Sequence, residues 1–541
     1  MNVPRPRARD GITRSLSVGF GGLNYTQGAQ DGDIYRMQNL SSKDYPVLST
    51  RPPRAFYGTV DAPGGFGSWD GLYWVTDEMF FYNGLPRGSV TEGTKTFATL
   101  GAYIVIMPDK AYYNVLTGEF GQLEAEYIGK AGTLKYSNGN YLGVPADNNT
   151  LITTGDPFPF RAGDCISISG NTTIPTNNRA AIVVQGVSAD KKSLYFYSDV
   201  FYIPEGARPF PIAESLVLKR SVPDMDFMCE NDNRLWGCKA DSIYASGLGT
   251  IFDWMSLSAE SDTNAWQAQV GSESDFTGCV SYRGTPMFFK ENDVYRVYGD
   301  LPSNYSIQRT ATIGVMEGSS KSLAVAGETL FYLSRAGVMA YDGGRPASLS
   351  APFGTERYRD GVAGTDGLKY YIGMTDKSGE RWLYVYDTER QLWHVEDLTT
   401  VCDFAFYREN LYMMSANGRI DIIGDVFDAP VGVTIEETFE WFCEFGDFIE
   451  GNPNKKTMPK LLMRCELAPE ARCEVLIRYD SSGDWLPFAR LDATQKQSFY
   501  LPLIPHRCDH YRLRFEGVGG FRLYSLTREY HSGSANRSHR T

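Results

Sequence analysis

The chain has 541 residues, 42% of them hydrophobic, and its 65 acidic residues outnumber its 52 lysines and arginines to give a formal net charge of −13. A protein whose whole surface grips nucleic acid is basic, so this charge argues against that class and leaves room only for a local basic patch. The longest apolar runs are short, such as YIVIM at 103–107, so no membrane-spanning segment is expected.

The composition favours an all-β fold. Aromatic residues make up 13% of the chain, and there are 55 glycines and 27 prolines. Aromatic side chains are common in strands, whereas glycine and proline are common in turns. The nine cysteines include no CxxC pair and no zinc-type spacing with histidine, so we expect free, mostly buried thiols made in a reducing cytosol.

Residues 1–54 have little periodicity and are predicted to form an extended N-terminal arm that lies over other surfaces or completes a blade. The first fourteen residues, MNVPRPRARDGITR, carry four arginines against one acidic residue. An extended segment of this composition suits ordering on a binding partner. We therefore expect a partner-docking arm formed by Arg5, Arg7, Arg9 and Arg14.

A strand–turn–strand pattern recurs along the chain. FYLSRAGVMAYDGG at 331–344 reads as two strands joined by a turn at Arg335-Ala336-Gly337. Looser copies recur about 40 residues apart where nothing intervenes, which is the period of a β-propeller blade. We predict six or seven blades from residues 55–120 and 223–434, with a series of β-sandwiches as the alternative. The copies begin near residues 71, 101, 233, 285, 328, 367 and 409.

Two regions interrupt this period. Residues 121–222 hold several short strands with polar turns and are predicted to form an inserted small β-barrel. Residues 435–531 alternate with a period of two between closely spaced turns, which indicates a C-terminal antiparallel β-sandwich. Residues 532–541 are predicted to be a flexible tail.

Candidate catalytic and metal-binding residues are scarce. The five histidines are His394, His506, His510, His531 and His539. His506 and His510 would lie about 13 Å apart on one strand, too far to share a metal without a bend. Neither GxSxG nor HExxH occurs, and YDSSGDW at 479–485 reads as a tight hairpin. We expect no catalytic, cofactor-binding or metal-binding residues, and a protein that is not an enzyme.

Aromatic residues in propeller loops could bind sugars. The tryptophans in the predicted blades lie at strand positions, where they are expected to fill the core instead. These are Trp236, Trp254, Trp382 and Trp393.

Three segments carry a resemblance to a known family: SIYASGLGTIFDWMSL at 242–257, GCVSYRGTPMFFKENDVYRVYGDLPSNYSIQ at 278–308 and GETLFYLSRAGVMAYDGG at 327–344. They resemble the tail hub or nozzle proteins of short-tailed phages, which include the packaged-DNA stabilisation proteins. LNYTQGAQDGDIYRMQNLSSKDYPVLSTRPPR at 23–54 is similar to the start of prophage virion proteins. The insert resembles the small barrel of a half-domain of ubiquitin-activating enzymes, where the barrel is structural, so Cys165 is expected to have no thioester chemistry.

The resemblance implies a structural virion protein of a bacteriophage tail or head–tail junction. It would form a ring, a homohexamer, below the portal and adaptor, and would retain packaged DNA and conduct it during ejection without reading its sequence. Its other partners would be tail fibres or spikes, and it would be made in the bacterial host cytoplasm. Two alternatives remain open, a receptor-binding or fibre-attachment module of the virion and a propeller glycoside hydrolase or depolymerase. No cofactor is expected, and the channel surface is expected to be acidic so that DNA slides.

Overall fold

The computed structural model describes residues 11–26, 31–139, 148–197, 200–207, 209–257, 261–451, 454–480, 484–492 and 495–532. Across these ranges the chain is all-β, and its helical segments are three short 3-10 helices, η1 (Pro175–Asn177), η2 (Ser320–Ser322) and η3 (Ala351–Phe353). None of the described helices has the length and apolar character needed to cross a membrane. Internal contacts divide the chain into a central unit, Ala62–Ser320, and a terminal unit made of Met1–Asp61 and Lys321–Thr541.

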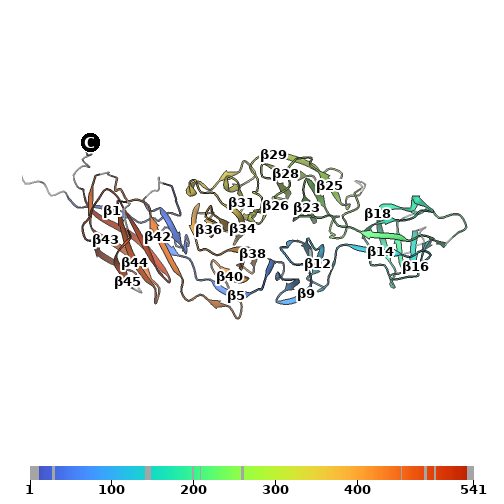
Figure 1. Ribbon diagram of the computed structural model, residues 1–541, viewed down its shortest axis with the longest axis horizontal. Helices are drawn as coiled ribbons and strands as arrows, with labels where there is room; N and C mark the ends of the chain where they lie inside the picture. Colours follow the sequence, from blue (N-terminus) through green and yellow to red (C-terminus); the bar gives the residue numbers. More distant parts are fainter. Residues whose placement is uncertain are drawn as a thin grey trace, which may run out of the picture. The chain divides into compact units, whose positions relative to one another are not determined.

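The central unit contains four sheets of four antiparallel strands, each in sequence order (Figure 1). In each sheet the middle strands are largely buried and the last strand is more exposed, which is the pattern expected when sheets pack face to face. The strands are β6 (Pro63–Ser68), β7 (Leu72–Thr76), β8 (Met79–Tyr82) and β9 (Leu85–Ser89); β10 (Thr96–Leu100), β11 (Tyr103–Met107), β12 (Ala111–Asn114) and β13 (Phe120–Gln122); β22 (Phe227–Asn231), β23 (Arg234–Lys239), β24 (Ser242–Ala245) and β25 (Trp266–Gln269); and β26 (Gly278–Tyr282), β27 (Thr285–Phe289), β28 (Asp293–Tyr298) and β29 (Ser306–Ala311).

Between β13 and β22, the central unit carries an eight-stranded sheet in the order β14-β21-β17-β18-β19-β16-β15-β20. Strands from both ends of this order contribute to one hydrophobic core, which includes Tyr127, Tyr136, Leu194 and Leu218. The sheet therefore wraps around its own core as a small β-barrel. Its strands are β14 (Ala125–Gly129), β15 (Leu134–Gly139), β16 (Asn148–Thr153), β17 (Cys165–Ser169), β18 (Arg179–Val187), β19 (Ser193–Phe196), β20 (Phe210–Pro211) and β21 (Leu216–Arg220).

The terminal unit contains three further sheets of the same blade type. In the first of them, the FYLSRAGVMAYDGG hairpin forms as predicted, with Ser334 opposite Gly337 across a two-residue turn. The strands are β30 (Ala324–Ala326), β31 (Thr329–Ser334), β32 (Gly337–Tyr341) and β33 (Ala347–Ser348); β34 (Arg359–Thr365), β35 (Lys369–Thr375), β36 (Arg381–Asp387) and β37 (Leu392–Val395); and β38 (Val401–Tyr407), β39 (Asn410–Ser415), β40 (Arg419–Ile423), β5 (Ala55–Thr59) and β41 (Thr434–Ile435).

The third of these sheets joins two distant parts of the chain. Its fourth strand is β5, which pairs antiparallel with β40, so that Thr59 lies opposite Arg419 and Ala55 opposite Ile422. An early strand thereby completes a sheet whose other blade strands come after residue 400. This closure removes the open edge that β40 would otherwise present.

The rest of the terminal unit is a pair of antiparallel sheets, with strand orders β3-β4-β49-β43-β46 and β2-β42-β48-β44-β45. β1 extends the first sheet by pairing with β49, and β47 pairs with β43. The strands are β1 (Thr13–Ser17), β2 (Ile34–Gln38), β3 (Leu40–Ser41), β4 (Leu48–Thr50), β42 (Glu440–Phe445), β43 (Lys456–Leu467), β44 (Arg472–Tyr479), β45 (Leu486–Leu491), β46 (Gln497–Pro502), β47 (Arg507–Cys508), β48 (Tyr511–Val518) and β49 (Phe521–Ser532).

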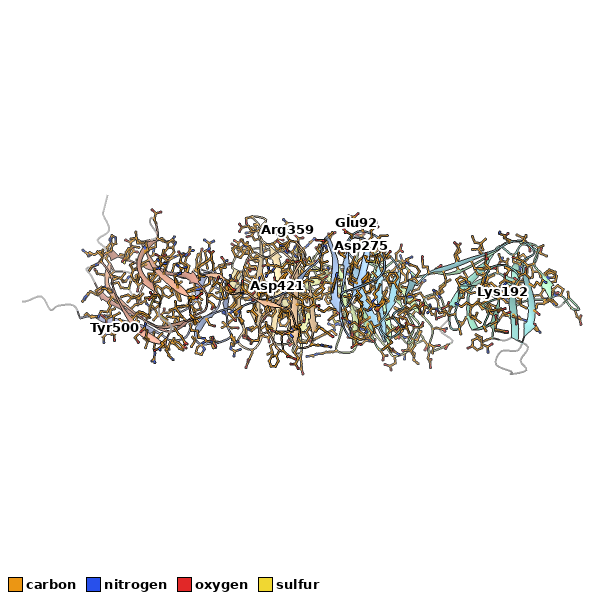
Figure 2. The ribbon with its side chains drawn as sticks, turned by 90° about the horizontal axis from the view of Figure 1, so that it is seen from below. Glu92, Lys192, Asp275, Arg359, Asp421 and Tyr500 are labelled. Carbon is orange, nitrogen blue, oxygen red and sulfur yellow. The ribbon has the colours of Figure 1, made fainter. Side chains whose placement is uncertain are left out.

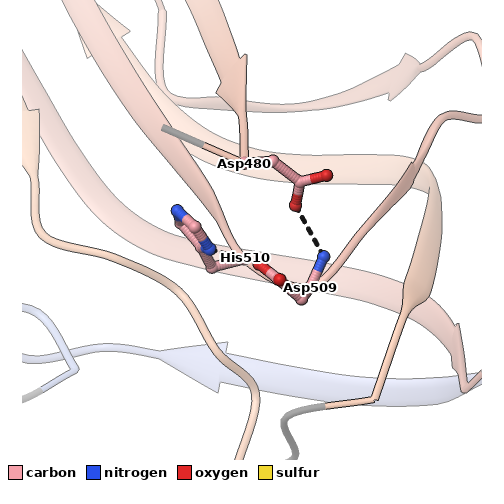
Figure 3. Close-up of side chains that lie close together, drawn as sticks. All are labelled: Asp480, Asp509 and His510. Carbon is pink, nitrogen blue, oxygen red and sulfur yellow. Dashed lines mark hydrogen bonds and ion pairs between the residues drawn. The ribbon is translucent and has the colours of Figure 1, made fainter. Parts of the chain in front are cut away.

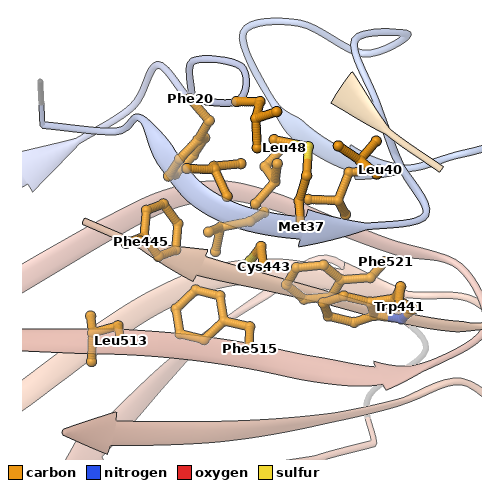
Figure 4. Packing of buried hydrophobic residues seen from close by; sticks show 14 of the residues in the cluster. Phe20, Met37, Leu40, Leu48, Trp441, Cys443, Phe445, Leu513, Phe515 and Phe521 are labelled. Carbon is orange, nitrogen blue, oxygen red and sulfur yellow. The ribbon is translucent and has the colours of Figure 1, made fainter. Parts of the chain in front are cut away.

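The prediction that residues 1–54 form an extended arm is wrong for the residues described. β1 to β4 are strands of the C-terminal sandwich, and Phe20, Met37, Leu40 and Leu48 are buried in its core (Figure 4). The physical reason is that β49 and β42 have edges that the early residues fill, while their apolar side chains enter the space between the sheets.

The fold class predicted from the sequence is confirmed: the protein is all-β and has blade sheets of the β-propeller type, an inserted small β-barrel and a C-terminal antiparallel sandwich. The described residues contain seven blade-type sheets, four in the central unit and three in the terminal unit. A ring of six or of seven blades stays a prediction.

Candidate functional site

A cavity of about 540 Å³ in the terminal unit gathers aromatic and charged side chains. This volume lies within the range of about 300–1,000 Å³ that is typical of small-molecule sites. Three segments supply most of it, namely the stretch around β2, the segment from η3 to Tyr358 and the β35–β36 hairpin, and β37 and β42 add one residue each. The lining residues are Tyr25, Tyr35, Arg36, Met37, Phe353, Gly354, Thr355, Glu356, Tyr358, Asp376, Glu380, Trp382, Tyr384, Val395 and Phe442.

Three tyrosines of this cavity meet through their hydroxyl groups. The Tyr384 hydroxyl donates to that of Tyr358 at 3.2 Å, and it also bonds Tyr25. Burial raises the pKa of all three phenols, and neighbouring carboxylates add to the effect for Tyr25 and Tyr358. They therefore stay protonated at neutral pH and present O–H groups that can both donate and accept hydrogen bonds.

Three carboxylates stand around the tyrosines. Asp376 Oδ1 accepts hydrogen bonds from the Ser378 and Glu380 backbone N–H groups at 2.8 and 3.0 Å, which fixes the β35–β36 turn. Within the described residues, no hydrogen bond reaches its Oδ2 or the Glu380 side chain. Among the residues that the structure describes, Glu356 has one cationic partner, Lys377, at 3.7 Å. The cavity thus offers carboxylate oxygens that are free to accept further hydrogen bonds.

The cavity also offers a cation and flat aromatic surface. Arg36 is exposed and makes no hydrogen bond or ion pair to the described residues. Trp382 is half-buried, and Tyr25 and Tyr35 are partly exposed, with their ring centroids 6.3 Å apart at a steep angle. Hydrogen-bond donors, acceptors and π-faces are therefore all present on one concave surface.

A second cluster joins Asp480, Asp509 and His510 in the C-terminal sandwich (Figure 3). One ligand atom from each lies within 4.8 Å of the others. Asp480 Oδ1 accepts the Asp509 backbone N–H at 2.7 Å, and the His510 Nδ1 bonds the Asp509 carboxylate. Burial tends to raise the pKa of Asp509, but the hydrogen bond with His510 outweighs it, and the pKa is lowered. These groups satisfy one another, so the cluster is explained as the junction between the end of β44 and the start of β48.

This cluster escaped prediction from the sequence. The sequence suggests His506 as the neighbour of His510, whereas in the structure its neighbours are Asp509 and Asp480, which is 30 positions earlier in the chain. His506 instead lies against the Tyr479 ring, with centroids 4.8 Å apart. Because β44 and β48 pair along their length, with Tyr479 opposite Tyr511, residues that follow one strand meet residues that precede the other. The pairing of β44 with β48 cannot be predicted from the spacing of residues along the sequence.

One of the four arginines of the predicted docking arm lies within the described residues, and docking of the arm stays a prediction. Arg5, Arg7 and Arg9 fall outside the described residues. Arg14 lies in β1, where its Nε contacts Glu529 Oε1 at 2.8 Å. Its partner is therefore within its own chain, on the neighbouring strand β49.

The remaining sequence predictions concern tryptophans, a histidine and thiols. Trp236 and Trp393 are buried in strands, as predicted. Trp254 is also buried, but it lies in the loop after β24 and not at a strand position, and Trp382 is half-buried and lines the cavity. His394 is buried in β37, and that burial lowers its pKa to about 3. All nine cysteines are free, and each is buried or half-buried; burial raises the pKa of the Cys165 thiol to about 12, which keeps it protonated and unreactive.

Comparisons with known proteins leave the family open. No family model matches the chain, and neither does any curated protein. Among solved structures, a computationally designed protein, Ika8, is similar at 10% identity and a TM-score of 0.35, covering 69% of this chain and 100% of its own. BamB from Moraxella catarrhalis is similar at 13% identity and a TM-score of 0.30, covering 77% of this chain and 99% of its own.

A third similar structure is an exo-β-1,3-galactanase from Phanerochaete chrysosporium with galactose, at 9% identity and a TM-score of 0.22. It covers 56% of this chain and 94% of its own. At TM-scores this low, none of the likenesses indicates what this chain does. The sheets define its class, a β-propeller-type protein with two added β-domains.

Proposed function

We propose that the chain is a structural protein of a bacteriophage tail or head–tail junction, forming a ring that retains packaged DNA and conducts it during ejection. The observation that carries this proposal is the way the ends of the chain are locked together. Residues before 60 supply strands to the sandwich and to the last blade-type sheet of the terminal unit. Such interleaving suits a part that must resist force and not open.

Buried ion pairs reinforce this lock. Arg51 contacts Glu436 at 2.7 Å, and Arg54 contacts Glu396 at 2.7 Å and Asp397 at 2.9 Å. Both arginines are buried, so removing a carboxylate partner would leave a buried guanidinium charge without that counter-ion and without water to solvate it. These contacts hold the segment before β5 against the sheet of β34–β37 and the strand β41.

The segments that carry the family resemblance also form fixed structure. In 242–257, β24 leads into a loop in which Asp253 Oδ1 accepts the backbone N–H groups of Met255 and Ser256, both at 3.1 Å. Trp254 is buried there, and its indole N–H donates to the Ile251 carbonyl at 2.9 Å. The resemblance therefore rests on a loop with defined packing and hydrogen bonds.

The acidic charge supports a conduit more than a clamp. Connections between successive sheets of the central unit expose Glu92, Glu273 and Asp275; Figure 2 labels the first and last of these. A conduit of this sign would repel DNA weakly and let it slide, whereas a basic one would hold the phosphates. In this proposal, contacts between subunits are apolar, hydrogen-bonded or locally complementary in charge, because each copy carries a net charge of −13.

The test is assembly of the full-length chain, measured by light scattering and negative-stain microscopy, with duplex DNA titrated at low salt. The proposal expects rings, with six copies, and weak DNA binding. A persistent monomer in the presence of the portal and adaptor proteins would contradict the ring. Tight DNA binding that weakens steeply with salt would contradict the sliding conduit and favour a clamp.

A receptor-binding or fibre-attachment role is the second candidate, and the cavity of the terminal unit is the observation that favours it. The same cavity bears on the glycoside hydrolase alternative, because it combines aromatic rings with Glu356, Asp376 and Glu380. Such an enzyme needs two carboxylates placed across the bond that it breaks. Release of reducing sugar from a polysaccharide by the purified chain would indicate a glycoside hydrolase, whereas binding without release would favour the receptor-binding module.

A further inference from the structure

The proposed ring function gives no role to the cavity bounded by Tyr25, Trp382 and Glu380, whose lining is more polar than that of a packed core. A buried core is filled by apolar side chains, yet here a space of about 540 Å³ is bordered by carboxylate oxygens and a guanidinium that no described residue pairs with. The question is which ligand matches this set of groups.

The aromatic groups favour a ligand with C–H faces. Trp382 is half-buried and Tyr25 is partly exposed, so each can present a ring surface, whereas the Arg512 guanidinium lies over the Tyr35 ring, 4.6 Å from its centroid. The negative face of an aromatic ring attracts the partly positive hydrogens of C–H groups. One face of a pyranose ring presents such hydrogens together.

The polar groups favour a ligand with several hydroxyls. Asp376 Oδ2 and the Glu380 carboxylate accept no hydrogen bond from the described residues, and an ionised carboxylate accepts strongly from O–H donors. Arg36 can donate in return. Vicinal hydroxyls of a sugar both donate and accept, so they match carboxylates and a guanidinium at once.

The tyrosines argue against an organic cation, the other ligand that carboxylates and aromatic rings attract. A cage for a quaternary ammonium turns aromatic faces toward the charge. Here the hydroxyl ends of Tyr358 and Tyr384 meet at 3.2 Å, with Tyr25 joined to them, and the Glu356 and Asp376 charges act on the Tyr25 and Tyr358 phenols. This part of the lining is a polar cluster of O–H groups and not a wall of π-faces.

We propose that this cavity is a binding site for a neutral saccharide, with Trp382 stacking on the sugar ring and Asp376 and Glu380 accepting its hydroxyl protons. The inference goes beyond the ring function and does not depend on it, because the site lies within one chain. It names a ligand class for a virion receptor-binding role, should the chain have one.

The experiment uses the purified full-length chain and a panel of methyl glycosides of glucose, galactose, mannose and N-acetylglucosamine, with choline chloride as the cation probe. Saturation-transfer NMR identifies binders, and titration gives Kd. We expect at least one glycoside to bind with a Kd at or below about 1 mM. Glu380→Gln should weaken it about tenfold, the effect of losing a hydrogen bond to a charged group.

The matched control is Glu389→Gln, an exposed glutamate on the β36–β37 turn of the same sheet, which does not line the cavity. It should bind like the parent chain. Trp382→Ala should abolish binding. Because this residue also packs against the core, Trp382→Phe serves as a second variant: if its melting curve matches that of the parent, any change in Kd reports on binding and not on folding. No glycoside binding, binding of choline alone, or equal Kd values for Glu380→Gln and Glu389→Gln would each overturn the proposal. Failure of the chain to form rings would leave it standing.

Discussion

Arg54 precedes Glu396 by 342 positions in the chain, yet its Nη2 donates a hydrogen bond to Glu396 Oε2 across 2.7 Å, and both side chains are buried. Asp397 adds a second carboxylate, 2.9 Å from Nη1. Burial alone would lower the pKa of Arg54, but the two carboxylates raise it overall, so the arginine stays charged. This triad joins the segment before β5 to the end of the β34–β37 sheet.

Replacing Arg54 should be strongly destabilising. Arg54→Ala leaves Asp397 without its direct ion pair and leaves Glu396 with only the longer contact to Arg51 at 3.9 Å, and the expected loss is about 3–5 kcal/mol of unfolding free energy. Urea denaturation measures it. The control is Arg522→Ala, which breaks the half-exposed pair with Asp44 at 2.8 Å and should cost less than about 1 kcal/mol. Equal losses for the two variants would show that the buried triad contributes no more to the unfolding free energy than a half-exposed ion pair.

His394 should make the fold sensitive to acid. Its pKa falls from 6.5 to about 3 in the folded chain, because of burial and the nearby charge of Lys369. Between these values the unfolded chain binds a proton that the folded chain does not, so stability is retained above pH 6.5 and falls as the pH drops toward 3, by up to about 1.4 kcal/mol per unit. Denaturation of His394→Phe at pH 7.5, 5.5 and 4.5 should show a shallower loss than the parent. If the stability of both proteins falls equally with pH, His394 is not the cause of the acid sensitivity.

Removing the first strand should destabilise the sandwich. Arg528 donates to Ser17 at 2.7 Å and to Ser15 at 3.0 Å, and β1 covers the edge of β49. Deletion of residues 1–17 should therefore lower the melting temperature by several degrees, whereas deletion of 1–10 removes none of these contacts and should leave it close to the parent value. If both truncations melt like the parent, β1 contributes nothing to the fold.

Gly418 should resist substitution because of β5. It has a φ of +82°, and a Cβ added there would lie 1.6 Å from the carbonyl oxygen of Val60. Gly379 has a φ of +89° with nothing within 4 Å of its added Cβ. Both alanine variants carry the cost of left-handed backbone, about 1–2 kcal/mol, so any excess loss in Gly418→Ala measures the close approach of the chain after β5. The two variants unfolding alike would argue against that approach.

We expect no glycosidase activity. Incubation of the full-length chain with cell-wall or capsule preparations should release no reducing sugar above the heat-treated control. Release that disappears in Asp376→Asn or Glu380→Gln would contradict this prediction and make the cavity a hydrolase site. The binding measurement described above would still hold in that case.

The fold could be predicted further than the cavity. Hairpins such as 331–344 carry their own turn chemistry and recur about 40 residues apart, so the blade-type sheets were visible in the sequence. β1 to β4 were not, because Phe20, Leu23, Ile34 and Met37 are separated by turns and show no simple period. The cavity was out of reach for a stronger reason: Tyr25, Glu380 and Phe442 come together only through the fold.

The position of β5 has a consequence for how the protein is made. A ribosome synthesises residues 55–59 long before β40, and Glu396, the partner of Arg54, is synthesised 342 residues after it. Until then β5 has no neighbour, and the apolar side chains of β2 and β4 have no sandwich to enter. Native structure at the N-terminus can therefore form only after most of the chain has left the ribosome, which favours slow, late folding and a stage that chaperones would shield. A nascent chain stalled before residue 396 would expose these strand edges, and is the species from which aggregation should start.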